Sequence, residues 1–285
     1  MKLGMDSNAT AQFQIELHEP LYPSLTLSEI QQNYQALHHD LRGSEVSYNM
    51  YHAFHDKLQL LPDIEVTNCV CLGLGTLTGV EGQRLSLLEV IRREESLHQL
   101  VVLTMILDTD LLGARHAVRN VWFQDPVFSQ TDKIFLESLG FTVVQRPKAL
   151  EKITSNTFVF APRVSYNLIV KVLTACHPAL YMGNRLDHLV KQLSVPVAKS
   201  SLDPLPLMVL ETLTRFKDAS RLVPFPVLED FPVLEDFPVL EDSRFSSWTK
   251  ITGIHWLRKE GEGGTLGEYC EQVSGKLRVP GFGHC

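Results

Sequence analysis

The feature that most constrains this 285-residue chain is an apolar stretch at residues 66–72 that runs directly into Gly73 and Gly75. Valines, cysteines and a leucine in close succession are typical of a buried β-strand, and glycines at its end indicate a sharp turn. Such strand-to-loop corners belong to doubly wound α/β sheets, which bind ligands at the carboxyl ends of their strands. The sequence therefore predicts an open sheet that begins with this strand.

Further segments with strand and helix signals alternate along the chain. Four more strand candidates follow the first, at residues 120–125, 141–145, 157–160 and 179–182. Helical spacing or capping signals occur at residues 28–43 (with Ser28 as N-cap), 45–58, 84–112, 132–139 (closed by Gly140) and 164–174. Alternating strands and helices imply right-handed crossovers. The predicted fold class is α/β: a Rossmann-like, doubly wound, mostly parallel sheet of about five strands with an N-terminal helical pair.

Changes in composition divide the chain into three parts. We expect an N-terminal arm and helical pair in residues 1–60, the Rossmann-like core in 61–200 and a C-terminal extension in 201–285. The extension repeats Phe-Pro-Val-Leu-Glu-Asp three times without change, in residues 225–242. A proline at every sixth position is incompatible with a helix or a central strand, which predicts an exposed extended loop; a partner-binding strip is the alternative. Residues 245–258 are apolar enough to pack back on the core.

Composition and charge narrow the class of protein. A formal net charge of −7 gives no general attraction to nucleic acid, so an RNA partner would need a local basic patch. No uninterrupted apolar stretch approaches the roughly 20 residues that a bilayer requires, and the N-terminus lacks a basic region followed by an apolar run. Five cysteines form no disulfide framework in a chain of this size. We therefore expect a cytoplasmic protein with no membrane partner.

The glycine loop and its neighbours give only a weak ligand signature. The third glycine, Gly79, comes one residue late for a dinucleotide fingerprint, and no acid ends a clear strand about 20 residues on. The glycines still indicate that the backbone closely approaches a ligand or a packed helix. Cys69 and Cys71 share one face of the strand without further ligands nearby, so we expect core cysteines, no metal and no cofactor.

Several polar residues fall where the predicted strands end. Asp125 ends the second predicted strand, where its carboxylate is suited to a ribose diol, to a guanidinium or to capping the next turn. Arg163 follows the fourth strand and Asn184-Arg185 the fifth. The two arginines are suited to phosphate or carboxylate at the same edge, with solvated surface positions as the alternative.

Short motifs in this order resemble the Sensitivity-to-Red-Light-Reduced-like domain family over about residues 65–190: Gly73-Leu74-Gly75, Asp125-Pro126-Val127-Phe128, Asp132, Leu136-Glu137-Ser138-Leu139-Gly140, Ala161-Pro162 and Gly183-Asn184. That family usually has Met-Pro-His-Cys where this chain has Phe160-Ala161-Pro162-Arg163, and a serine where this chain has Arg185. Both departures fall at the predicted ligand edge, which indicates a divergent activity.

These departures, with Ile254-His255-Trp256, are similar to a fungal branch of the family that resembles arginine-containing cyclodipeptide synthases. The resemblance implies an aminoacyltransferase of secondary metabolism that condenses arginyl-tRNA with a second aminoacyl-tRNA to a diketopiperazine, with no DNA partner. It implies Thr76 or Thr78 as acyl acceptor, since bacterial synthases use a serine just beyond their first strand. Aminoacyl esters are already activated, so the absence of an ATP-binding loop fits such an enzyme.

Under this resemblance, Asp125 would bind the arginyl guanidinium. The full set of expected substrate contacts is Gly73, Gly75, Asp125, Arg163, Asn184 and Arg185. The expected tRNA contacts are Arg84, Arg92, Arg93, Arg115 and Arg119. Two other interpretations stay open: a non-enzymatic regulatory or interaction protein of the family, and a nucleotide or methyl-donor binding enzyme that uses Gly73, Gly75 and Asp125.

Overall fold

The computed structural model describes residues 21–42, 44, 47–48, 52, 65–79, 83–108, 118–176, 178–194, 205–224 and 252–257. Its helices are α1 (Leu27–Arg42), α3 (Leu87–Asp108), α4 (Gln130–Ser138), the short 3-10 helix η2 (Leu150–Lys152), α5 (Tyr166–Cys176), α6 (Leu186–Ser194) and α7 (Leu205–Ala219). Its strands are β1 (Asn68–Leu72), β2 (Asn120–Gln124), β3 (Thr142–Val143), β4 (Thr157–Ala161), β5 (Leu180–Asn184), β6 (Ser220–Pro224) and β7 (Thr252–Leu257).

Within the described residues, the strands form one sheet in the order β3-β2-β1-β4-β5-β7-β6. The first five strands pair in parallel, which confirms the predicted Rossmann-like α/β fold. The last two come from beyond residue 201 and extend the sheet: β7 runs antiparallel to both β5 and β6. Residues 252–257 of the apolar segment that the sequence predicts to pack back on the core therefore do so as a strand of the sheet, between β5 and β6.

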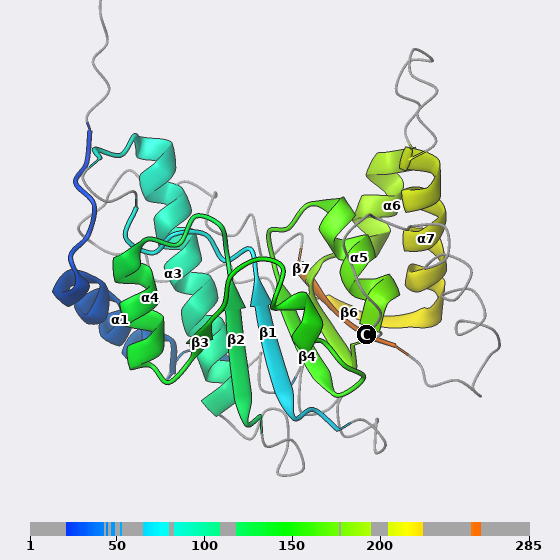
Figure 1. Cartoon of the computed structure of the whole chain (residues 1–285), viewed down its shortest axis with the longest axis horizontal. Helices are drawn as coiled ribbons and strands as arrows, with labels where there is room; N and C mark the ends of the chain where they lie inside the picture. The colour runs from blue at the N-terminus through cyan, green and yellow to red at the C-terminus, as the bar shows by residue number, and fades with distance from the viewer. Residues whose placement is uncertain are drawn as a thin grey trace, which may run out of the picture.

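Helices cover both faces of the sheet (Figure 1). Cys69 and Cys71 of β1 point into a core built with α1, α3 and α4, while Val70 and Leu72 point into a second core built with α5, α6 and α7. Alternation along a strand explains this division, since successive side chains face opposite sides of a sheet. Both cysteines are buried, as predicted, and burial raises the pKa of the Cys69 thiol.

The helix predictions hold where the structure describes the chain, with one shifted cap. Helix α1 begins at Leu27, so Thr26 rather than Ser28 is its N-cap; Thr26 and Glu29 exchange hydrogen bonds as a capping box. Helices α6 and α7 and strand β6 are additions that the sequence analysis does not anticipate. The predicted helix 45–58 and the repeat 225–242 lie mostly or wholly outside the described residues.

Candidate functional site

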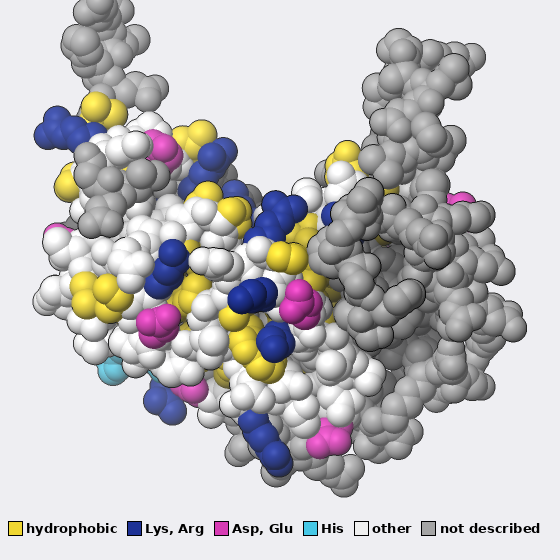
Figure 2. Space-filling view, viewed as in Figure 1, with side chains coloured by type: hydrophobic (Ala, Val, Ile, Leu, Met, Phe, Trp, Pro, Cys, Tyr) yellow, Lys and Arg dark blue, Asp and Glu magenta, His cyan; other side chains and the backbone are white. Residues whose placement is uncertain are grey.

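The strand register brings the predicted edge residues level with one another. Leu72 of β1 pairs with Gln124 of β2, and Cys71 pairs with Phe160 of β4. The next residues along these strands place Gly73 between Asp125 on one side and Pro162-Arg163 on the other. Strand order reverses between β1 and β4, which is where an open α/β sheet binds its ligands. Figure 2 shows the surface hollowed between the α3 side and the α5–α6 side.

Asp125 ties the glycine loop to the end of β2. The Gly75 N–H donates to one carboxylate oxygen at 2.8 Å, and the Val127 N–H donates to the other at 2.9 Å. The second bond is the turn cap that the sequence left open as an alternative. Each carboxylate oxygen has two lone pairs, so Asp125 keeps acceptor capacity on both. Its side chain is partly exposed, which leaves that capacity open to a ligand.

The two glycines of the corner are required by the protein's own packing. Gly73 has a φ of 68°, and a Cβ there would lie 2.5 Å from Val164 Cγ1. Gly75 has a φ of 87°, and a Cβ there would lie 2.6 Å from Ser96 Oγ of α3. The sequence left two reasons open for a close backbone approach, a ligand or a packed helix. In the structure, the element packed against Gly75 is helix α3, and the element packed against Gly73 is the β4–α5 loop.

Asp132 of α4 organises the other end of the loop. Its carboxylate accepts the hydroxyls of Thr76 and Thr78, each at 2.8 Å. It also accepts backbone N–H groups at 2.8–3.1 Å, from Leu77, Thr78 and Ser129. Asp132 is fully buried, so these donors replace the water that the carboxylate loses.

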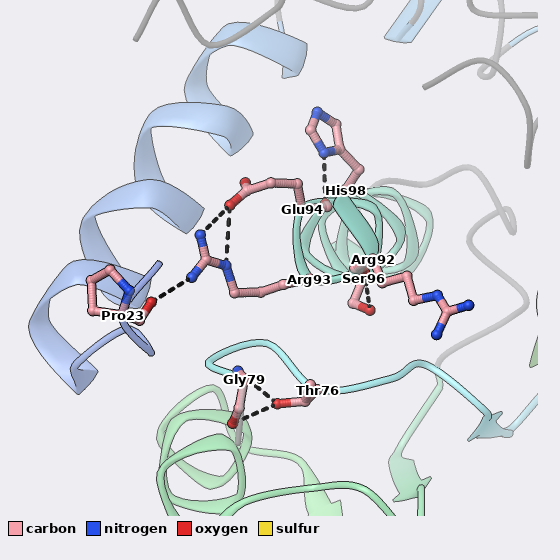
Figure 3. A network of polar contacts seen from close by, with 8 residues as sticks. All are labelled: Pro23, Thr76, Gly79, Arg92, Arg93, Glu94, Ser96 and His98. Atoms are coloured by element: carbon pink, nitrogen blue, oxygen red, sulfur yellow. Dashed lines mark hydrogen bonds and ion pairs between the residues drawn. The ribbon is translucent and has the colours of Figure 1, made fainter. Parts of the chain in front are cut away.

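Both hydroxyls that the resemblance implies as acyl acceptors are therefore used to hold this loop. Thr78 is buried at 2% exposure, and the Thr76 hydroxyl also accepts a hydrogen bond from the Gly79 N–H at 2.9 Å (Figure 3). Both hydroxyls point to Asp132 of α4. The sequence did contain a signal for this cluster, because Ser129-x-x-Asp132 is the spacing of a capping box.

Arg163 lies on the other side of Gly73 and reaches α3. Its Nη1 forms an ion pair with Glu95, whose side chain is only 5% exposed, whereas that of Arg163 is 36% exposed. Neither Glu95 nor its neighbour Ser96 was among the expected site residues. Residues in mid-helix carry no edge signal in the sequence; only the path of α3 past the end of β1 brings them here.

The last two expected substrate contacts lie one strand further away. Arg185 forms a two-point ion pair with Asp187, at 3.1 Å from Nε and 2.7 Å from Nη2, and this hydrogen bonding lowers the pKa of Asp187. Asn184 ends β5, and within the described part of the chain its buried Oδ1 has no hydrogen-bond partner. The structure thus groups Gly73, Gly75, Asp125 and Arg163, with Asn184 and Arg185 beside them at the end of β5.

The four described arginines among those expected to contact tRNA do not gather on one face. Arg93 is buried and bonds to Glu94 at 3.0 Å and to the Pro23 carbonyl at 3.3 Å (Figure 3). Arg119 precedes β2 and Asp125 follows it, so the two lie at opposite ends of this strand. Arg84 and Arg92 are exposed near the start of α3. Arg115 lies outside the described residues. In Figure 2, Lys and Arg side chains are interspersed with acidic and apolar ones.

Neither a metal site nor a membrane-spanning helix is found among the described residues. No group of three or more His, Cys, Asp or Glu side chains is arranged there to hold a metal ion. None of the helices described is both long and apolar enough to cross a membrane.

Comparisons with solved structures return methyltransferases at low similarity. One is a Klebsiella pneumoniae protein described as an O-methyltransferase, at 12% identity and a TM-score of 0.33 over 81% of this chain and 89% of that chain. Another is the plantazolicin methyltransferase BpumL in complex with SAH, at 12% identity and a TM-score of 0.31 over 81% of this chain and 88% of that chain. No curated protein matches the sequence.

Comparison with protein families gives a match that covers most of the chain. Residues 51–247 match the SRR1 domain, which is the Sensitivity-to-Red-Light-Reduced-like family of the sequence motifs. None of the comparisons supports the narrower resemblance to cyclodipeptide synthases. The chain belongs to the SRR1 domain family.

Proposed function

We propose that this SRR1 domain binds a nucleoside-containing small molecule at the carboxyl ends of β1, β2 and β4, with Asp125 accepting hydrogen bonds from the ribose hydroxyls. The observation behind this proposal is the position of the Asp125 carboxylate. It is partly exposed at the end of β2 and is held beside the β1 corner by the Gly75 N–H at 2.8 Å. In doubly wound sheets, an acid near the β1 corner holds a ribose diol.

The chemistry of the carboxylate fits two vicinal hydroxyls. Gly75 and Val127 each occupy one lone pair, on different oxygens, so one further lone pair remains on each oxygen. Two hydroxyls on adjacent carbons can donate to the two oxygens at once. The same two backbone bonds fix the orientation of the carboxylate before a ligand arrives, which lowers the entropic cost of binding.

The spacing along the chain explains why the sequence alone did not favour this reading. Asp125 follows Gly75 by 50 residues, well beyond the roughly 20 residues of a standard dinucleotide site. The long helix α3 and the segments that flank it occupy that interval. The acid is nevertheless at the end of the adjacent strand, which is the spatial relation that a ribose site needs.

Isothermal titration calorimetry on the full chain tests the proposal. The probes are adenosine, guanosine and uridine with their 5′-monophosphates, together with the matching 2′-deoxy compounds. We expect saturable binding of at least one ribose compound and weaker binding of its 2′-deoxy form. Asp125→Asn should weaken the ribose compound by about tenfold or more, because a charged acceptor contributes roughly 1.5–3 kcal/mol.

The matched control is Ser129→Ala. It removes the N-cap of α4 beside the same loop but leaves the Asp125 carboxylate in place, so affinity should stay within about twofold of wild type. Failure of every ribose compound to bind the wild-type chain would refute the proposal. So would an Asp125→Asn variant that still distinguishes ribose from 2′-deoxyribose as the wild type does.

The partly exposed carboxylate of Asp125 also favours a second candidate, because it could pair with the guanidinium of arginyl-tRNA. The hydroxyls of Thr76 and Thr78 both donate to Asp132, which counts against the role of acyl acceptor that the resemblance implies for them. Incubation of the chain with tRNA, synthetases, ATP and amino acids, followed by mass spectrometry, decides the matter. A ribonuclease-sensitive arginine diketopiperazine would establish the transferase; its absence, with arginyl-tRNA shown to be present, would dismiss it.

A further inference from the structure

We infer that Arg163 receives an oxyanion, a carboxylate or a phosphate, on the 5′ side of the nucleoside ligand, and that Glu95 positions its guanidinium for this role. The inference rests on the proposed nucleoside site and adds the chemical class of the ligand's second half. Its starting point is a buried acid that holds a partly exposed arginine at the point where strand order reverses.

Asp125 and Arg163 lie on opposite sides of the same glycine. Strands β2 and β4 are the two neighbours of β1, so their ends are two strand spacings apart, about 10 Å. The register keeps these ends level, and the Arg163 carbonyl oxygen lies 3.5 Å from the position of a Cβ on Gly73. A nucleoside with a short 5′ substituent spans such a distance with its ribose at Asp125 and the substituent toward Arg163.

Helix α3 contributes the acid to two Arg–Glu pairs, and the two arginines differ in exposure. In the pair of Arg93 and Glu94, both side chains are buried, at 5% and 2% exposure, so the arginine is closed to a ligand. In the pair of Arg163 and Glu95, the acid is also buried, at 5% exposure, but the arginine is 36% exposed. A guanidinium that only neutralised Glu95 could be buried in the same way as Arg93.

The guanidinium also has donors to offer. Arginine carries five N–H groups in a planar fork, and the contact with Glu95 is made through Nη1. Carboxylates and phosphates bind such forks through two parallel hydrogen bonds, a geometry that the ammonium group of lysine does not reproduce. Glu95, reaching out from α3, fixes the fork at the mouth of the site.

Pairs of ligands with and without an anionic group test the inference by calorimetry. For the carboxylate, S-adenosylhomocysteine is compared with methylthioadenosine; for the phosphate, AMP is compared with adenosine. The wild type should prefer the anionic member of at least one pair, and the pair that shows this preference identifies the anion. Arg163→Lys should reduce the preference by about tenfold while leaving the neutral compound unchanged, because the fork is lost and the charge is kept.

Arg163→Gln should abolish the preference, and the lysine variant serves as the test if removal of the charge beside Glu95 prevents folding. Arg42→Lys, at an exposed position in the last turn of α1, is the matched control and should behave as wild type. Equal weakening of neutral and anionic members in the Arg163 variants, or no preference in the wild type, would overturn the inference alone. No binding of any adenosine compound would overturn the proposed function as well.

Discussion

The loop of residues 73–79 is held by an aspartate at each end, and the two aspartates differ in burial and in the number of hydrogen bonds they accept. Asp132 is fully buried, and five hydroxyl or N–H donors converge on its carboxylate. Asp125 is partly exposed and accepts two backbone N–H groups. The first carboxylate is saturated by the protein; the second has lone pairs left.

This difference distinguishes a carboxylate that stabilises the fold from one that can accept hydrogen bonds from a ligand. A buried carboxylate must be satisfied internally, because an unpaired charge away from water is costly. An exposed one needs no such saturation, and two backbone bonds are enough to orient it. The Asp132 end of the loop therefore provides rigidity, and the Asp125 end provides the acceptor that we assign to a ligand.

The largest effect is expected at the saturated end. Asp132→Ala removes the acceptor for five donors at once and should lower the free energy of unfolding by about 3–5 kcal/mol, since buried donors are left without partners. Urea unfolding followed by circular dichroism measures this loss. A loss below about 1 kcal/mol would show that the cluster does not anchor the loop, and the comparison would collapse.

A buried histidine of helix α3, His98, should make the stability of the protein depend on pH. Burial lowers the pKa of His98 to about 4 from an ordinary value of 6.5, while its Nδ1 lies 2.8 Å from the Glu94 carbonyl oxygen. In the unfolded chain this histidine is protonated below about pH 6.5, whereas in the folded protein it is protonated only below about pH 4. Stability is therefore full above pH 6.5 and falls with pH in that window, by up to about 3 kcal/mol.

Unfolding in urea at pH 7.5, 6 and 5 checks this prediction. His98→Gln removes the titrating group, so its free energy of unfolding should depend less on pH than that of the wild type across the window. Identical slopes for both chains would assign the acid sensitivity to other groups.

A third prediction separates packing from backbone strain at the glycines. Gly75→Ala adds a Cβ at 2.6 Å from Ser96 Oγ in a residue with a φ of 87°, whereas Gly140→Ala, at a φ of 84°, meets no atom within 4 Å. Both variants incur the cost of a left-handed alanine, about 1 kcal/mol, and Gly75→Ala adds the clash for a total of about 2–3 kcal/mol. Equal losses in thermal or urea unfolding would show that Ser96 simply moves aside.

The sequence predicted the sheet well because its signals are local. The apolar strands, the Gly140 cap and the capping pattern of α4 are each encoded within a few residues. The edge residues Asp125 and Arg163 were also predictable, because parallel strands share one carboxyl edge. No local signal could show that Thr76 and Thr78 turn toward Asp132, more than 50 residues away, or that Glu95 meets Arg163.

The smallest effect on stability is expected at the open end of the loop, where the effect on binding should be largest. Asp125→Asn keeps the shape of the side chain and one acceptor oxygen, so the bonds from Gly75 and Val127 cannot both be kept. Water can replace the lost bond at this partly exposed position, which limits the loss to about 1 kcal/mol in urea unfolding. A loss as large as that of Asp132→Ala would mean that Asp125 is a second structural anchor. A small loss of stability together with a tenfold or greater loss of nucleoside affinity is the signature that distinguishes a ligand acceptor from a scaffold carboxylate.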